Sequence, residues 1–170
     1  MIQLYTRWSS QVTPDNVLPE YPRPMMARES YINLNGLWDY AFTTFKDAPT
    51  EYEGQILVPF SPEAVLSGVN RQLQPEEYLW YRRNISVEDW SSRKDSRRML
   101  LHFGAVDQSC IVYVNGADVA SHTGGYLPFS VDISDVLKDG DNELTVRVMD
   151  LSDTSYHARG KQKTGGEYSA

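Results

Sequence analysis

The dipeptide Asn115-Gly116 separates two runs of apolar and β-branched residues, and it constrains the fold more than any other feature of the sequence. Both central residues of a two-residue hairpin turn take a positive φ, which Asn and Gly adopt at low cost. The sequence therefore predicts an antiparallel hairpin, with residues 110–114 on one side and a return strand that contains Val119. Gly124-Gly125 follows without a lysine or a helix pattern, so we interpret it as a sharp corner between sheets.

Alternation of apolar and polar residues recurs along most of the chain, in short runs bounded by turn residues. The clearest runs are residues 37–42, 55–58, 79–87, 99–105, 127–133 and 144–148. No segment keeps the spacing of an amphipathic helix over the length that such a helix needs. Many short strands with turns between them are typical of an antiparallel β-sandwich, and we predict an all-β fold of this kind.

The first 30 residues differ from the rest because they contain Pro14, Pro19, Pro22 and Pro24 and show little periodicity. A residue before proline is pushed towards an extended conformation. We therefore expect residues 1–30 to form an extended arm packed on the domain and residues 31–170 to form one β-sandwich.

The net charge of −7 opposes binding to nucleic acid, which requires a basic surface, and binding to anionic lipid. No apolar run approaches the roughly 20 residues of a membrane span, and no signal peptide is visible after Met1. We expect a soluble protein. The single cysteine, Cys110, excludes an internal disulfide but leaves the compartment open between cytoplasm and an exported location.

Residues that could carry catalysis or hold a metal are scattered. His102, His122 and His157 lack metal-ligand spacing, and we predict no metal site. We interpret His102 as a packed or hydrogen-bonded strand residue and Cys110 as an inert buried thiol. Asn142-Glu143 follows a turn and opens a strand, so we assign it a structural role. The phosphate-loop and dinucleotide motifs are also missing, and we predict no cofactor and no catalytic residue.

Five motifs in a fixed order resemble one protein family. They are Leu34-Asn35-Gly36-Leu37-Trp38, Val58-Pro59-Phe60-Ser61-Pro62-Glu63, Trp80-Tyr81-Arg82-Arg83, the tract around Asn115-Gly116 and Arg159-Gly160-Lys161-Gln162. Together they resemble the N-terminal sugar-binding domain of family 2 glycoside hydrolases, the β-galactosidases and β-glucuronidases. The resemblance implies a jelly-roll sandwich of the galactose-binding-domain type.

The resemblance also implies that catalysis and sugar contact lie in different parts of the parent enzyme. The parent enzyme would be a retaining glycoside hydrolase, β-galactosidase-like, whose two glutamates lie in a catalytic barrel of about 250 residues. That barrel cannot be contained in this chain, and the Trp-Tyr strand and Gly-Ile-Trp element that follow the loop in the family are absent from it. We therefore expect a fragment that is inactive alone, packs against the barrel and comes from a parent that forms homo-oligomers.

Sugar contact is the chemistry that remains for this chain. Of the loop over residues 150–162, Arg159, Lys161 and Gln162 match the family motif, and we predict that they contact substrate together with Asp150 and Tyr126. A solvated or interdomain loop is the alternative. Trp80 and Tyr81 could stack on a sugar, but core packing beside an ion pair of Arg82 or Arg83 also explains them.

Two other functions fit the same residues. A freestanding carbohydrate-binding module would need a self-sufficient exposed aromatic platform. A sandwich used only for protein–protein assembly would need no sugar at all. The sequence alone leaves all three functions open.

Overall fold

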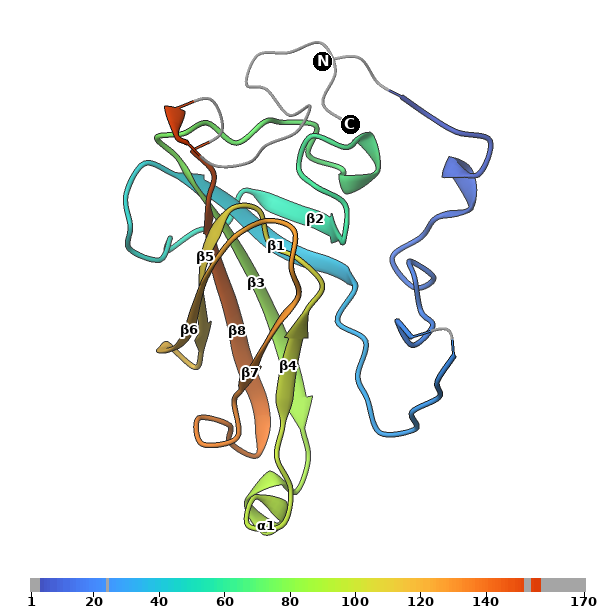
Figure 1. Cartoon of the computed structure of the whole chain (residues 1–170), viewed down its shortest axis with the longest axis vertical. Helices are drawn as coiled ribbons and strands as arrows, with labels where there is room; N and C mark the ends of the chain where they lie inside the picture. The colour runs from blue at the N-terminus through green and yellow to red at the C-terminus, as the bar shows by residue number, and fades with distance from the viewer. Residues whose placement is uncertain (1–3, 24, 152–153, 157–170) are drawn as a thin grey trace.

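The computed structural model of the chain describes residues 4–23, 25–151 and 154–156. These residues form two antiparallel sheets (Figure 1). The larger has the strand order β2-β1-β3-β8-β5-β6, and the smaller pairs β4 with β7. The strands are β1 (Gly36–Thr43), β2 (Gly54–Val58), β3 (Tyr78–Val87), β4 (Leu100–Phe103), β5 (Ser109–Val114), β6 (Ala117–Thr123), β7 (Phe129–Asp132) and β8 (Gly140–Met149). The predicted antiparallel β-sandwich is confirmed.

Helical structure in the described residues is limited to short turns. They are the 3-10 turns η1 (Ser9–Gln11) and η2 (Val65–Ser67) and the helix α1 (Trp90–Arg93). Trp90 is buried and its indole Nε1 donates a hydrogen bond to the carbonyl of Ser134 at 3.1 Å. The helix α1 thereby closes one end of the sandwich.

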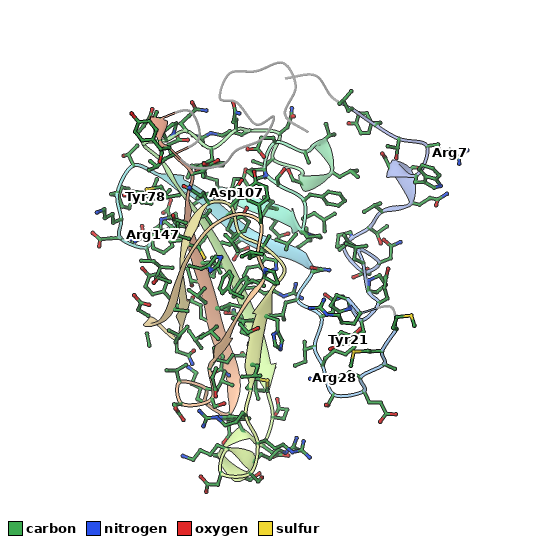
Figure 2. The ribbon with its side chains drawn as sticks, in the orientation of Figure 1. Arg7, Tyr21, Arg28, Tyr78, Asp107 and Arg147 are labelled. Carbon is green, nitrogen blue, oxygen red and sulfur yellow. The ribbon has the colours of Figure 1, made fainter. Side chains whose placement is uncertain are left out.

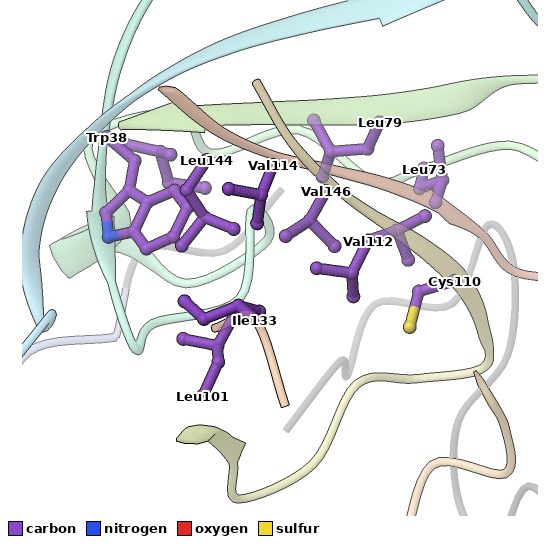
Figure 3. Close-up of a cluster of buried hydrophobic side chains, with 12 residues drawn as sticks. Trp38, Leu73, Leu79, Leu101, Cys110, Val112, Val114, Ile133, Leu144 and Val146 are labelled. Atoms are coloured by element: carbon purple, nitrogen blue, oxygen red, sulfur yellow. The ribbon is translucent and has the colours of Figure 1, made fainter. Parts of the chain in front are cut away.

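The core lies between the two sheets and is built from the alternating residues of each strand (Figure 3). Val112, Val114 and Leu144 from the large sheet are fully buried. Leu101 and Ile133, from the side of the small sheet, belong to the same cluster. Because successive strand residues point to opposite faces, every second residue of β5 and β8 enters this core.

A stack of three rings joins the small sheet to the edge of the large one. Phe103 and Phe129 lie 4.7 Å apart with an interplanar angle of 11°, and His122 of β6 lies 4.2 Å from Phe129 at 13°. The His122 Nε2 hydrogen bonds to the carbonyl of Gly124 at 3.0 Å. His102 is exposed and hydrogen bonds through Nδ1 to Ser130 of the paired strand at 2.6 Å, as its position in a strand predicted.

The first strand begins at Gly36, and the preceding described residues belong to neither sheet. They run beside the sandwich along the right of Figure 1. Asn33 Nδ2 donates a hydrogen bond to the carbonyl of Leu18 at 2.7 Å, and Val17 is buried. The division into an arm over residues 1–30 and a sandwich over residues 31–170 stays a prediction.

The side chain of Asn142 fixes the start of β8 from within the core. It is fully buried, and its Nδ2 donates hydrogen bonds to the carbonyls of Lys138 at 2.8 Å and Gly140 at 2.9 Å. Its Oδ1 accepts hydrogen bonds from the backbone N–H of Lys138 at 2.9 Å and from Asn115 Nδ2 at 2.8 Å. The structural role expected for Asn142-Glu143 is therefore confirmed.

Asn115 connects this network to the predicted hairpin. Its φ is +52° and that of Gly116 is +80°, as the turn between β5 and β6 requires. Its Oδ1 accepts a hydrogen bond from the backbone N–H of Glu143 at 3.0 Å, and its Nδ2 also donates to the carbonyl of Val136 at 2.9 Å. One side chain thus serves the turn and the neighbouring strand at once.

Replacement of Asn142 by alanine should lower the free energy of unfolding by about 3 kcal/mol, because it removes a fully buried amide and leaves several partly buried partners unpaired. Urea denaturation measures this change. The control is Asn84→Ala, which removes an exposed amide from the paired strand β3 and should change the stability by less than about 0.5 kcal/mol. Equal small effects from both variants would contradict the assignment.

Cys110 lies in the core and is only 4% exposed. Burial raises the pKa of its thiol to about 11, because the thiolate is penalised in an apolar environment. The predicted inert buried thiol is consistent with this environment.

The raised pKa of Cys110 predicts a loss of stability in alkali. The thiol ionises more readily in the unfolded chain, so its contribution is complete below the unfolded pKa and is lost as the pH rises through about 11. Between pH 8 and pH 11, wild type should lose about 2 kcal/mol of unfolding free energy relative to Cys110→Ala. Urea denaturation across this range tests it; parallel pH profiles for the two proteins would refute it.

Candidate functional site

The end of the large sheet at which β8 finishes gathers loops from several parts of the chain. The register pairs Thr43 with Tyr78, Leu79 with Val148, and Ser109 with both Met149 and Thr123. The ends of β1, β6 and β8 and the beginnings of β3 and β5 therefore meet here. In Figure 2 the labelled residues Tyr78, Asp107 and Arg147 lie in this region. We call it the β8 exit end.

A short chain of backbone hydrogen bonds joins three of these segments. The N–H of Gly124 donates to the carbonyl of Gln108 at 2.8 Å, and the N–H of Gln108 donates to the carbonyl of Met149 at 3.4 Å. Tyr126 follows Gly124 by two residues, and Asp150 follows Met149 directly. The structure thus places the predicted contacts Tyr126 and Asp150 at the same end of the sheet.

The glycine corner between β6 and β7 has a positive φ at Gly124 and no room for a side chain at Gly125. Gly124 has a φ of +118°, and a Cβ added to Gly125 would lie 2.3 Å from Oδ1 of Asp107. The peptide bond between Asp107 and Gln108 is cis. The corner presents Tyr126 to solvent with 63% of its surface exposed. The interpretation of Gly124-Gly125 as a corner between sheets is confirmed.

The outer face of the sheet near this end is closed by aromatic and arginine side chains. Trp80 is 2% exposed, and its Nε1 donates a hydrogen bond to Oγ1 of Thr43 at 3.1 Å. Its ring stacks on Tyr113 with centroids 6.0 Å apart, and the guanidinium of Arg147 lies 5.7 Å from it. Trp80 is therefore a packing residue and offers no free face to a sugar.

The neighbouring residues of β3 support the same conclusion. Burial, with a smaller contribution from the charge of Glu63, raises the pKa of the Tyr81 phenol. Arg82 forms the expected ion pair, since its Nη2 lies 2.8 Å from Oδ2 of Asp39. Arg83 instead donates from Nη1 to the carbonyls of Leu34 and Asn35, both at 2.8 Å. The core alternative for Trp80 and Tyr81 is the one that the structure supports.

Sequence reasoning missed a polar cluster in the connection that leads to β3. The Nη2 of Arg71 donates to Oε1 of Glu77, and Oε2 of Glu77 accepts a hydrogen bond from the N–H of Gln74 at 3.2 Å. The guanidinium of Arg71 lies 3.8 Å from the ring centroid of Phe42. The spacing of residues in this connection carries no periodic signal, so the sequence gives no indication of the cluster.

Asn70 belongs to the same connection and has a φ of +52°. Its buried Oδ1 has no hydrogen-bond partner among the described residues. Burial of an amide oxygen without a hydrogen-bond donor costs free energy.

The remaining predicted contacts, Arg159, Lys161 and Gln162, lie outside the described residues. Within the part of the chain that is described, no three His, Cys, Asp or Glu side chains are grouped to hold a metal ion. None of the described helices has the length and apolar character needed to cross a bilayer.

Chemically, the β8 exit end combines an exposed phenol ring with carboxylates. Aromatic faces pack against the C–H surfaces of sugars, and carboxylate oxygens accept hydrogen bonds from hydroxyl groups. Tyr126 and Asp150 are side chains of these two kinds.

Comparison with known proteins gives a family match over residues 69–162, to the domain described as "Glycosyl hydrolases family 2, sugar binding domain". The β-glucuronidase of Canis lupus familiaris is 35% identical over 136 residues, which cover 71% of this chain and 20% of that protein. The β-galactosidase of Thermoanaerobacter pseudethanolicus is 31% identical over 122 residues, covering 69% of this chain and 16% of the relative. The chain spans about a fifth of the length of such relatives.

Solved structures show the same similarity. The β-glucuronidase of Bifidobacterium dentium, complexed with coumarin-3-O-glucuronide, has a TM-score of 0.54 and 29% identity over 68% of this chain and 19% of its own. An uncultured Clostridium β-glucuronidase has a TM-score of 0.54 and 26% identity over 68% of this chain and 21% of its own.

The contact between Gly125 and Asp107 yields a stability prediction for this end of the sheet. Gly125→Ala should lower the free energy of unfolding by about 2 kcal/mol, because the added methyl group overlaps the Asp107 side chain. Gly104→Ala is the matched control, since nothing lies within 4 Å of its added Cβ.

Thermal or urea denaturation compares the two variants, and Asp107→Ala in the Gly125→Ala background should recover part of the loss. Additive effects in this double-mutant cycle would show that the two residues are not in contact.

Proposed function

Because this chain belongs to the sugar-binding domain family of the family 2 glycosyl hydrolases, we propose that it forms one wall of the substrate pocket in a larger glycoside hydrolase. The observation that carries the proposal is the convergence at the β8 exit end. Tyr126, Asp150 and the start of the loop that contains the family motif all lie there. The family match extends from the connection before β3 to Gln162, so it covers every one of these segments.

The chemistry of the proposed parent enzyme is cleavage of an O-glycosidic bond with retention of configuration. This reaction needs two carboxyl groups about 5 Å apart, one acting as nucleophile and one as acid and base. We assign both to a catalytic barrel beyond this chain, which the domain contacts through the β8 exit end. In this arrangement the present chain supplies positioning, and the barrel supplies the reacting groups.

The substrate class that we propose is a β-glucuronide or a β-galactoside. The relatives do not support an assignment to β-galactosidases alone, because β-glucuronidases are prominent among them. We place β-glucuronides first for this reason. The basic side chains of Arg159 and Lys161 suit a substrate that carries a carboxylate.

Within the pocket wall, we assign ring stacking to Tyr126 and hydroxyl recognition to Asp150. Arg159, Lys161 and Gln162 would reach the sugar from the loop that follows. Such contacts orient the scissile bond relative to the barrel, and orientation contributes strongly to the rate of an enzymatic reaction.

The chain on its own should not hydrolyse glycosides. Incubation with p-nitrophenyl β-glucuronide and p-nitrophenyl β-galactoside should release p-nitrophenol at the rate of a buffer control, because we assign the reacting carboxyl groups to the catalytic barrel. Turnover well above this background would overturn the proposed division between binding and catalysis.

Binding to the isolated chain should be weak, with a dissociation constant of about 1 mM or higher, because one wall closes only part of a pocket. A titration with methyl β-glucuronide, followed by amide chemical shifts, should affect residues near Tyr126 and Asp150. Tyr126→Ala should abolish these shifts, whereas Leu127→Ala, which removes an equally exposed neighbour, should preserve them.

The same titration separates the alternatives. Micromolar affinity of the isolated chain would favour a freestanding carbohydrate-binding module. Spectra that stay unchanged with every sugar would favour a sandwich used only for protein assembly.

A further inference from the structure

The N-terminal segment contains an open hollow that is separate from the β8 exit end. Residues 20–23, 26–28 and 31 border an open volume of about 590 Å³, and the lining includes Glu20, Tyr21, Arg23, Met26, Arg28 and Tyr31. Small-molecule sites typically have volumes of about 300–1,000 Å³. In Figure 2, Tyr21 and Arg28 lie on the N-terminal segment, far from Tyr78, Asp107 and Arg147.

Contacts within the segment give this hollow a defined shape. The hydroxyl of Tyr31 donates a hydrogen bond to the carbonyl of Pro19 at 3.0 Å, which closes the loop at its base. The rings of Tyr21 and Tyr31 meet edge to face with centroids 5.0 Å apart. The backbone N–H of Met26 donates a hydrogen bond to the carbonyl of Arg23 at 2.9 Å. The walls are therefore arranged before any ligand arrives.

The walls combine apolar faces with hydrogen-bonding groups in the way that sugars require. Tyr21, Tyr31 and Met26 offer surfaces for the C–H groups of a pyranose ring. The carboxylate of Glu20 can accept hydrogen bonds from hydroxyl groups. These features alone would suit a neutral sugar.

The charge of the hollow selects an anionic ligand instead. The lining of the hollow carries two guanidinium groups, those of Arg23 and Arg28, and one carboxylate, that of Glu20. The hollow is therefore positively charged, whereas the whole chain has a net charge of −7. The Arg28 guanidinium lies 5.9 Å from the ring centroid of Tyr21, so charge and aromatic surface adjoin. Arg23 donates one hydrogen bond from Nη1 to the carbonyl of Pro22 at 2.9 Å. Because a guanidinium has five N–H donors, the group can also donate to a ligand.

We propose that this hollow is a second carbohydrate site, which binds a sugar carrying a carboxylate, such as a uronic acid unit. The carboxylate pairs with Arg28 and Arg23, the ring lies against the tyrosines, and the hydroxyls face Glu20. Arginine suits this task because its planar group pairs with both oxygens of a carboxylate. The site is independent of the pocket wall at the β8 exit end.

The test is a titration of the 170-residue chain with sodium glucuronate, glucose and sodium acetate, followed by residue-specific amide shifts. Glucuronate should produce saturable shifts at Tyr21, Ala27 and Tyr31, with an affinity at least tenfold above that of glucose or acetate. Arg28→Gln should weaken glucuronate binding about tenfold, and Tyr21→Ala should weaken it by a similar factor.

Arg7→Gln is the matched control for these variants. Arg7 also lies over an aromatic ring, 4.2 Å from the centroid of Trp8, but it is not part of the hollow. This change should leave glucuronate binding unaltered. Arg28→Lys, which keeps the charge and loses the forked geometry, should fall between wild type and Arg28→Gln. An unchanged amide spectrum elsewhere in each variant verifies the fold.

Three results would overturn the inference. Acetate binding as tightly as glucuronate would show a simple anion site, and glucose binding as tightly would remove the role of the carboxylate. Shifts confined to Tyr126 and Asp150 would leave the pocket wall intact and eliminate the second site. Shifts confined to the hollow would sustain the second site and count against the pocket wall, so the two proposals fail separately.

Discussion

The position of β8 between β3 and β5 is the constraint on which the rest of the structure depends. β8 pairs with β3 from Gly140 to Val148 and with β5 from Leu144 to Met149. Its inward residues Leu144, Val146 and Val148 all enter the core. The buried amide of Asn142 fixes where the strand starts, and the β8 exit end lies where it finishes. From Asn142 to Asp150 the chain runs about 25 Å at the rise of an extended strand. A network at one end of the molecule therefore decides where the proposed sugar contacts leave the sheet at the other.

Local chemistry accounts for what the sequence predicted correctly. Period-two alternation fixes which residues enter the core, and the positive φ values of Asn115 and Gly116 fix one hairpin. Gly125 is required because a Cβ would overlap Asp107, and the sequence indicated a corner there without revealing its cause. The strand order could not be predicted from the sequence, because β3 and β8 are far apart in the chain and pair only in the folded structure. Tyr126 and Asp150 lie at the same end of the sheet because β5 pairs with β8 and Gln108 bonds to Gly124 and Met149, which no local pattern reports.

The features that the sequence left open or did not indicate share a physical origin. Trp80 belongs to the outer face of the sheet, where alternation predicts contact with solvent. It is buried because Tyr113, Arg147 and the end of β1 cover it, and such covering depends on side chains from three other segments. The Arg71–Glu77 pair likewise arises within an irregular connection. Burial by neighbours that are remote in sequence leaves no periodic trace.

A weak contact is sufficient for the role proposed for the β8 exit end. When a pocket wall is part of the same polypeptide as the reacting groups, substrate bound by one surface is held near the other at a high effective concentration. The wall then needs to distinguish orientations of the sugar rather than capture it from solution. Tight binding by the wall alone would stabilise substrate and transition state equally and would add nothing to the chemical step. The exposed Tyr126 and half-buried Asp150 are suited to a surface that works against a second one.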